Sequence, residues 1–227
     1  PGQSRAYAIE TIVLDGDGHA AFALQLPDRL AGIPREGGDA AIRVVATVRD
    51  TAGREVRRSV GRVATTRPIR VTAVPEAGRL VQGVDNEVFV FVTTPDGRPV
   101  DATVTVDGVA SFRTGVHGVG SFTMRPGGLG APPIWTISVN VRTDDGNSYV
   151  HEMPVERTDG VILRANASYD AGETIAVEVL GSGSEPVFVD LLRDDQTYLT
   201  RTVRLVDGRG VLAIDLPLEL DGVLRLV

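Results

Sequence analysis

One stretch of sequence occurs three times in the chain and decides the fold class. Residues Gly208–Pro217 read Gly-Arg-Gly-Val-Leu-Ala-Ile-Asp-Leu-Pro. Gly18–Pro27 and Gly118–Pro126 repeat its pattern of a glycine turn, apolar residues at alternate positions and a closing proline. A period of two is typical of a half-buried strand, and proline cannot donate a hydrogen bond to a neighbouring strand. We therefore expect a strand at each of the three places.

Other segments recur at a similar distance along the chain, which indicates an internal repeat. The matching pairs are Val81–Val92 with Tyr169–Val179, Ile42–Gly53 with Trp135–Gly146, and Ile69–Val74 with Val161–Ala165. Gly172 follows Gly83 by 89 residues, and Arg142 follows Arg49 by 93. The order of these segments predicts a module of roughly 92 residues that recurs along the chain.

The composition fits a module made of short strands. The chain has 26 Gly and 13 Pro but only 5% aromatic residues, and no long stretch keeps the apolar period of a helix. Turn signals recur about every 8–12 residues, as in β-sandwiches. Hairpin turns are expected at Pro95–Gly97, Asp107–Gly108, Asp145–Gly146 and Asp207–Gly208. We predict an all-β chain of tandem antiparallel β-sandwiches of the immunoglobulin/fibronectin III type.

The repeat divides the 227 residues into three modules. Residues 1–67 form a sandwich that lacks its N-terminal strands, 68–157 form a complete sandwich, and 158–227 form a sandwich that lacks its C-terminal strands. The chain starts at Pro1 without a methionine, and the last repeat stops at Val227, where a terminal hairpin should begin. We therefore expect an excised part of a longer protein.

The residue types that are absent exclude several chemistries. The chain has no Cys, and all 23 of its basic residues are Arg, with no Lys. Disulfides, Cys-ligated zinc, thiol catalysis and thioester chemistry are therefore excluded. Schiff-base catalysis and the phosphate-binding lysine of a P-loop are excluded as well.

The net charge of −7 argues against nucleic acid as a partner. One basic run is an exception, because Arg49–Arg70 holds seven arginines against Asp50 and Glu55. A solvated hairpin with a linker is the expectation for this run, and a docking surface for an acidic partner domain is the alternative. No aromatic residue interleaves it, so it gives little support to single-stranded nucleic acid binding. No apolar run reaches about 18 residues, so we expect no membrane insertion in this segment.

Few residues qualify as ligands or catalysts. Asp15–Gly18 begins like a calcium loop, but no acidic residue follows before Asp28, so we interpret it as a hairpin turn. The histidines at 19, 117 and 151 lack the spacing of a zinc site, and His151-Glu152 is followed by Val155 where a second zinc ligand would stand. No Gly-x-Ser-x-Gly elbow occurs.

Two further features have structural interpretations. The only tryptophan, Trp135, is expected in the core beside Ile137. The Gly- and Pro-rich loop at 126–133 is expected to be a plain crossover between strands, with a contact site as the alternative. We predict no catalytic, cofactor-binding or metal-binding residue, and therefore no cofactor and no enzyme activity.

The order of the motifs resembles a known family. Pro68–Val106, with its glycines, its Asn86–Val92 strand and its Pro95–Val100 turn, resembles the macroglobulin-like domains of the α2-macroglobulin family. Gly18–Pro27 and Asp207–Leu226 resemble the same domains, so the resemblance extends over the whole chain as successive modules.

The resemblance implies seven-stranded sandwiches within a large secreted or periplasmic protease trap from a bacterial member of the family. The family's chemistry resides in a protease-cut bait segment and in a thioester built from Gly-Cys-Gly-Glu-Gln, and the chain has neither. It would be a non-catalytic structural segment outside those regions. Its partners would be other domains of the same parent chain and, through the parent protein, target proteases, in an extracellular or periplasmic location.

Two other functions remain open from the sequence. A tandem immunoglobulin-like adhesin or cell-surface stalk often binds Ca²⁺ at its module junctions, but the junction segments 65–68 and 156–159 hold few carboxylates. An accessory sandwich region of a larger hydrolase would need an exposed aromatic platform. One Trp and four scattered Tyr provide little material for such a platform.

Overall fold

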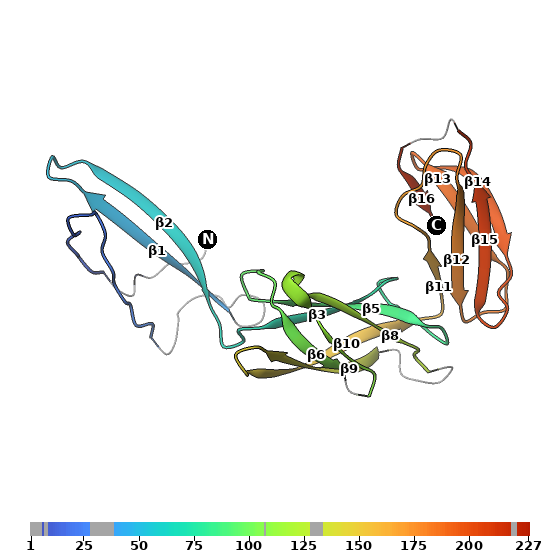
Figure 1. Cartoon of the computed structure of the whole chain (residues 1–227), viewed down its shortest axis with the longest axis horizontal. Coiled ribbons are helices and arrows are strands. Elements are labelled where there is room, and N and C mark those ends of the chain that lie inside the picture. Colours follow the sequence, from blue (N-terminus) through green and yellow to red (C-terminus); the bar gives the residue numbers. More distant parts are fainter. Residues whose placement is uncertain (1–5, 7–8, 28–38, 107, 128–133, 219–221) are drawn as a thin grey trace. The chain divides into compact units, whose positions relative to one another are not determined.

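The computed structural model describes residues 6, 9–27, 39–106, 108–127, 134–218 and 222–227 (Figure 1). It confirms the all-β class, and the only helix in these ranges is the single 3₁₀ turn η2, Gly115–His117. No helix among the described residues is long and apolar enough to cross a membrane. The chain divides into two compact units, one of residues 1–69 with 94–98 and one of residues 70–93 with 99–227.

A long antiparallel hairpin dominates the first unit. Strands β1 (Ala40–Arg49) and β2 (Glu55–Ala64) pair over ten residues each, and the last pair before the turn is Arg49 with Glu55. The turn is closed by Asp50, whose N–H donates to the Arg54 carbonyl at 3.0 Å. In the described part of this unit, no third strand joins the two-stranded sheet.

The strand expected at Gly18–Pro27 does not form, and that prediction was wrong. Residues 19–27 have no strand pairing, and the Phe22 side chain is 52% exposed. The reason is the lack of a hydrogen-bonded neighbour: the two related segments form strands because each pairs with a long buried strand. The described residues of the first unit offer Phe22 no such partner.

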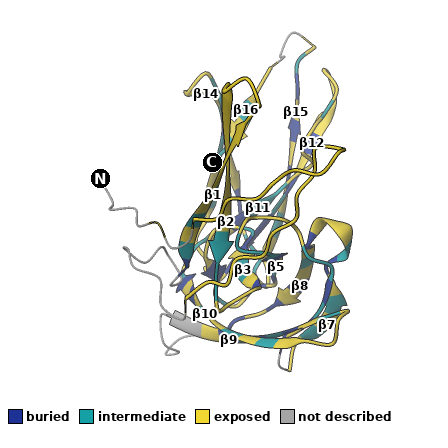
Figure 2. Cartoon of the chain, turned by 90° about the vertical axis from the view of Figure 1, so that its left-hand side faces the viewer, coloured by how far each residue is buried: buried dark blue, intermediate teal, exposed yellow. Residues whose placement is uncertain are grey.

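Eight strands and two sheets form the first sandwich of the second unit, here called the middle sandwich. The strands are β3 (Arg70–Pro75), β4 (Leu80–Val81), β5 (Asn86–Thr93), β6 (Ala102–Val106), β7 (Ala110–Arg113), β8 (Val119–Met124), β9 (Ile134–Thr143) and β10 (Ser148–Thr158). Their sheet orders are β3-β5-β8 and β4-β10-β9-β6-β7. The core positions Val90, Val104 and Val139 are fully buried. Figure 2 shows buried positions that alternate with exposed ones along the strands.

The remaining strands form what we call the C-terminal sandwich. They are β11 (Val161–Arg164), β12 (Thr174–Gly181), β13 (Val187–Arg193), β14 (Gln196–Val203), β15 (Arg209–Asp215) and β16 (Leu224–Leu226). The sheet orders are β11-β12-β15 and β14-β13-β16. Val177 of β12 and Leu191 of β13 are fully buried in one apolar cluster between the two sheets. The burial of alternate residues from both sheets is what makes this region a sandwich.

The sheet orders repeat from one sandwich to the next. The order β11-β12-β15 repeats β3-β5-β8, and β14-β13-β16 repeats β7-β6-β9. The hairpin β1–β2 repeats β9–β10 in register: Arg49 pairs with Glu55 as Arg142 pairs with Ser148. One short pairing departs from the antiparallel pattern, because Arg157 and Thr158 of β10 run parallel to β4.

Several expected turns form. Gly97 donates to the Thr94 carbonyl at 2.9 Å, and Gly146 donates to the Thr143 carbonyl at 3.0 Å. Asp207 and Gly208 both have a positive φ, as expected of an Asp-Gly hairpin turn. Asp107 lies outside the described residues, although Gly108 has the positive φ of such a turn.

Candidate functional site

The Asp15–Gly18 segment forms a turn, in agreement with its interpretation from the sequence. Oδ1 of Asp15 accepts the N–H of Asp17 at 3.0 Å and that of His19 at 2.8 Å. This carboxylate oxygen is therefore occupied by the backbone of the turn. Across the described ranges, no group of three or more His, Asp or Glu side chains is placed to hold a metal ion.

The structure places the other candidate residues on separate elements. His19 is exposed beside the first turn, His117 ends η2, and His151 lies in β10. The described loop residues Pro126 and Gly127 precede 128–133, which lie outside the described residues. Trp135 belongs to β9, but its side chain also lies outside what the structure describes, so its expected core position stays a prediction.

The first candidate site is the junction between the two sandwiches of the second unit. On sheet β11-β12-β15, Leu163 and Val179 point into the C-terminal sandwich, so the neighbouring positions Ile162 and Leu180 project from the outer face. An outer face normally contacts water, yet Ile162 is 2% exposed and Leu180 only 7%. Something outside the C-terminal sandwich must therefore cover these two side chains.

The end of β4 and the β4–β5 loop of the middle sandwich provide that cover. Val81 and Val84 are 1% and 3% exposed, and they form one apolar cluster with Ile162 and Leu180. Gly83 lies close enough that a Cβ on it would meet the Ser182 Cβ at 3.7 Å. Burial of apolar side chains of this size contributes about 1.5–3 kcal/mol for each one that is fully buried.

The buried Asn86 side chain fixes the conformation of the β4–β5 loop through hydrogen bonds to its backbone. The side chain is fully buried, and its Oδ1 accepts the Val81 N–H at 2.7 Å. Its Nδ2 donates to the carbonyls of Val81 and Val84, each at 2.8 Å. A buried amide with its hydrogen bonds satisfied costs little and fixes the loop, because each broken bond would leave a buried polar group.

An ion pair joins the sandwiches beside the apolar cluster. From β11, Arg164 donates from Nη2 to Glu76 Oε1 at 2.6 Å and from Nε to Glu76 Oε2 at 2.8 Å. The same Nη2 donates to the Asp85 carbonyl at 2.9 Å. This two-pronged geometry is the strong form of an Arg–carboxylate contact.

The charges around this pair are balanced. Glu178 of β12 lies 3.5 Å from Arg164 Nη1 and 2.7 Å from Arg209 Nε. Burial by itself would raise the pKa of Glu76, but hydrogen bonds from Arg164 and from the Glu87 N–H outweigh it and lower that pKa. The pKa of Arg164 is raised, chiefly by its hydrogen bonds to Glu76. Both side chains therefore stay charged at neutral pH.

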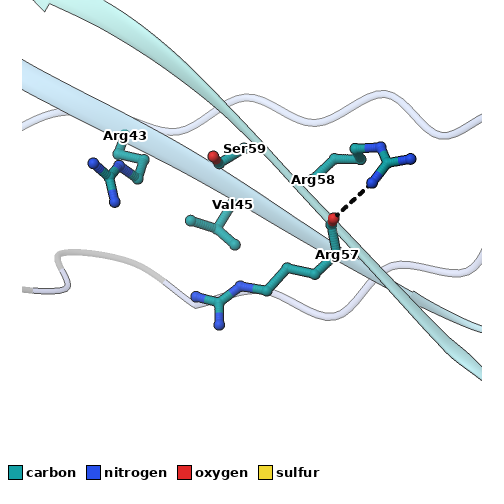
Figure 3. Close-up of a pocket in the computed structure, with 5 residues that line it drawn as sticks. All are labelled: Arg43, Val45, Arg57, Arg58 and Ser59. Carbon is teal, nitrogen blue, oxygen red and sulfur yellow. Dashed lines mark hydrogen bonds between the residues drawn. The ribbon is translucent and has the colours of Figure 1, made fainter.

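The second candidate site is the arginine-rich hairpin of the first unit. Figure 3 shows an open hollow on it, lined by Arg43 and Val45 of β1 and by Arg57, Arg58 and Ser59 of β2. Arg58 donates to the neighbouring Arg57 carbonyl at 3.4 Å. The basic run predicted as a solvated hairpin does form a hairpin, and all of its residues from 55 to 62 are exposed.

The arginine-rich hairpin could be predicted from the sequence, whereas the junction between the sandwiches was not. The seven arginines were apparent in the sequence, but the junction was missed. One signal in the sequence could have revealed the junction. Alternation predicts that one residue in two faces solvent, but the runs Val161-Ile162-Leu163 and Val179-Leu180 are apolar throughout. Such runs are typical of strands buried on both faces.

Comparison with known proteins adds little beyond the fold. No protein-family model and no curated protein matches the chain. Two bacterial structures are similar to it. One is Salmonella α2-macroglobulin reacted with methylamine, with a TM-score of 0.28 and 9% identity over 82% of this chain. The other is a Ca²⁺-stabilised adhesin with which an Antarctic bacterium binds ice, with a TM-score of 0.28 and 19% identity over 77% of this chain. The chain spans 15% and 48% of their respective lengths.

Proposed function

We propose that the chain is a non-catalytic structural segment of an α2-macroglobulin-like, protease-trapping protein, outside its bait and thioester regions. In this proposal the modules are 1–67, 68–157 and 158–227, the first and last of them partial sandwiches. Other domains of the parent chain are its direct partners, and it meets target proteases only through the parent. The parent acts outside the cell or in the periplasm.

The observation that supports a structural role is the junction between the two sandwiches. Arg164 and Glu76 form a two-pronged ion pair beside a cluster in which Leu180 and Val84 are buried. Sandwiches linked by a bare tether would reorient freely, whereas an apolar contact with a flanking ion pair resists rotation. A segment that holds its modules in fixed relation can transmit a conformational change through a large assembly.

The charges at the junction support this proposal over the alternative of a Ca²⁺-dependent stalk. Calcium requires six to eight oxygen ligands, usually from several carboxylates. At this junction Glu76 is paired with Arg164, and Glu178 is shared between Arg164 and Arg209. These two carboxylates are therefore neutralised by arginine side chains and not left available to a bridging cation. The melting temperature of the chain is accordingly expected not to change when Ca²⁺ is added or chelated.

Spin labelling tests the structural role directly. The chain has no cysteine, so Val150→Cys and Tyr198→Cys provide two unique attachment sites, which are 65% and 52% exposed in the two sandwiches. Pulsed electron paramagnetic resonance should give one narrow distance distribution, and this should broaden when Glu76→Ala and Arg164→Ala are added. A broad distribution in the otherwise unaltered chain would contradict a fixed junction.

The assignment to a protease trap can be tested only on the full-length parent protein. Capture of an active protease by the full-length parent, with the protease kept active on small substrates only, would support the trap. A catalytic domain or a cell-wall anchor in the same polypeptide, without protease capture, would overturn it. The chain by itself should hydrolyse no chromogenic ester, peptide or glycoside.

A further inference from the structure

A small hollow lies at the start of the C-terminal sandwich. Its volume is about 260 Å³, which is below the range of about 300–1,000 Å³ typical of small-molecule pockets. It has room for one long side chain. The lining residues come from the β10–β11 link, the β12–β13 loop and the strand ends beside them: Asp159, Gly160, Val161, Ser182, Gly183, Glu185, Pro186, Val187 and Leu205.

The corner of the sandwich that holds this hollow has an equivalent in the middle sandwich. In the C-terminal sandwich, the Gly181 N–H at the end of β12 donates to the Gly208 carbonyl at 3.0 Å. In the middle sandwich, the Val92 N–H near the end of β5 donates to the Gly118 carbonyl at 2.7 Å. The corner beside Gly181 therefore corresponds to the corner beside Val92.

The middle sandwich closes this corner with side-chain hydrogen bonds. Thr114 is only 3% exposed, and its hydroxyl donates to the Val100 carbonyl at 2.8 Å and accepts the Ala102 N–H at 3.0 Å. The η2 turn follows directly. In the C-terminal sandwich, residues 204–207 form no helical turn, and Leu205 lines the open hollow. The hollow is therefore a feature of this sandwich and not a requirement of the common fold.

One wall of the hollow is apolar and firmly held. Val161, at the start of β11, is 42% exposed, and Pro186 is exposed as well. Val187 and Leu205 are partly buried and also pack against the core cluster of the sandwich, which holds the wall in place. An occupant that covers these side chains with an apolar segment gains the free energy of that burial.

Two carboxylates flank the apolar wall, one on each connection. Asp159 lies in the β10–β11 link and Glu185 in the β12–β13 loop, and both are exposed. Neither forms an ion pair with any described residue. Arg204, next to Leu205, is exposed and pairs with neither of them. The hollow therefore offers two negative charges that the described part of the chain does not neutralise.

An apolar wall between two carboxylates fits a long cationic side chain. Arginine and lysine place their methylene stems on apolar surface and keep the charged group at a polar edge. A guanidinium group has donors for two carboxylates at once, which an ammonium group matches less well. A metal ion fits poorly, because the described residues that line the hollow include no third carboxylate and no histidine.

We propose that this hollow binds an arginine side chain presented by a partner polypeptide. The methylene stem lies against Val161 and Leu205, and the guanidinium group pairs with Asp159 and Glu185. The inference concerns the C-terminal sandwich alone and holds whether or not the parent protein traps proteases.

A nuclear magnetic resonance titration of the whole chain tests the proposal. The probe is an end-capped Gly-Arg-Gly peptide. It should cause saturable shifts at the amides of Gly160, Ser182, Gly183 and Leu205, with a dissociation constant of about a millimolar, as expected for one exposed contact. The same peptide with citrulline keeps the stem but has no charge, and it should bind at least about fivefold more weakly. Guanidinium chloride at the same concentration has the charge without the stem and should not reproduce the shifts.

Matched variants separate the two carboxylates from the net charge. Asp159→Asn with Glu185→Gln should weaken binding of the arginine peptide by about fivefold to tenfold, because two exposed pairs are lost. Glu152→Gln with Asp170→Asn removes the same charge from exposed positions that do not line the hollow, and it should leave binding unchanged. Circular dichroism confirms that both variants are folded.

Three outcomes would overturn the proposal. The first is no saturable shift at the residues that line the hollow. The second is equal binding of the citrulline peptide, which would show that charge does not contribute. The third is equal binding to the two double variants, which would indicate general attraction to an acidic protein.

Discussion

Arg164 and Glu76 stand 88 residues apart in sequence, and their side chains meet through two hydrogen bonds, of 2.6 and 2.8 Å. The contact joins strand β11 of one sandwich to the end of strand β3 of the other. Glu76 also accepts the Glu87 N–H at 2.7 Å, so the carboxylate is held within its own sandwich while it binds the neighbouring one. This anchoring keeps the glutamate in place to hold Arg164.

Replacement of Glu76 by Gln should destabilise the second unit by about 1–2 kcal/mol, because the partly buried Arg164 loses its counter-charge. The Arg164 side chain is 34% exposed, and solvent therefore weakens the effect. Chemical denaturation measures the change, and Glu152→Gln, at an exposed position of β10, is the control and should cost less than about 0.5 kcal/mol. Equal stability of the two variants would contradict the role of the pair.

The same pair predicts a dependence on acid. Because the folded pKa of Glu76 lies below its ordinary value of 4.5, its contribution to stability is complete above that pH and is lost as the pH falls through the lowered pKa. The difference in melting temperature between the unaltered chain and Glu76→Gln should therefore stay constant from pH 7 to about pH 5 and shrink towards pH 3. A gap that widened in acid would contradict the sign of this pKa shift.

Interactions that follow the two-residue period of a strand could be predicted from the sequence, and the others could not. Val104 and Val106 alternate with Thr103 and Thr105, so their burial was predictable from spacing alone. The prediction of a strand around Phe22 was wrong. Alternation shows which face of a strand would be buried, but it does not show whether a partner strand exists. The contact of Arg164 with Glu76 follows no period, since it depends on how two separately folded sandwiches meet.

The loop that fills the junction predicts a further effect. Asn86→Leu should destabilise the second unit by about 3 kcal/mol, because it leaves the Val81 N–H and the Val81 and Val84 carbonyls buried without their partner. Asn140→Ala is the control: it removes one exposed hydrogen bond with Ser148 and should cost less than about 1 kcal/mol. Thermal denaturation compares the two variants, and similar melting temperatures would show that the amide does not hold the loop.

Glycines with a positive φ provide the last prediction, because two of them differ in what surrounds them. Gly118 has a φ of 64°, and a Cβ there would lie 2.5 Å from the Val92 carbonyl oxygen and 2.9 Å from the Val100 nitrogen. Gly97 has a φ of 84°, with nothing within 4 Å of such a Cβ. Gly97→Ala should therefore cost only the backbone strain, about 1 kcal/mol, whereas Gly118→Ala adds a clash with backbone atoms that cannot rotate away and should cost at least about 3 kcal/mol. Denaturant midpoints measure both variants. If they were equally stable, close backbone contact would not be the reason for glycine at 118.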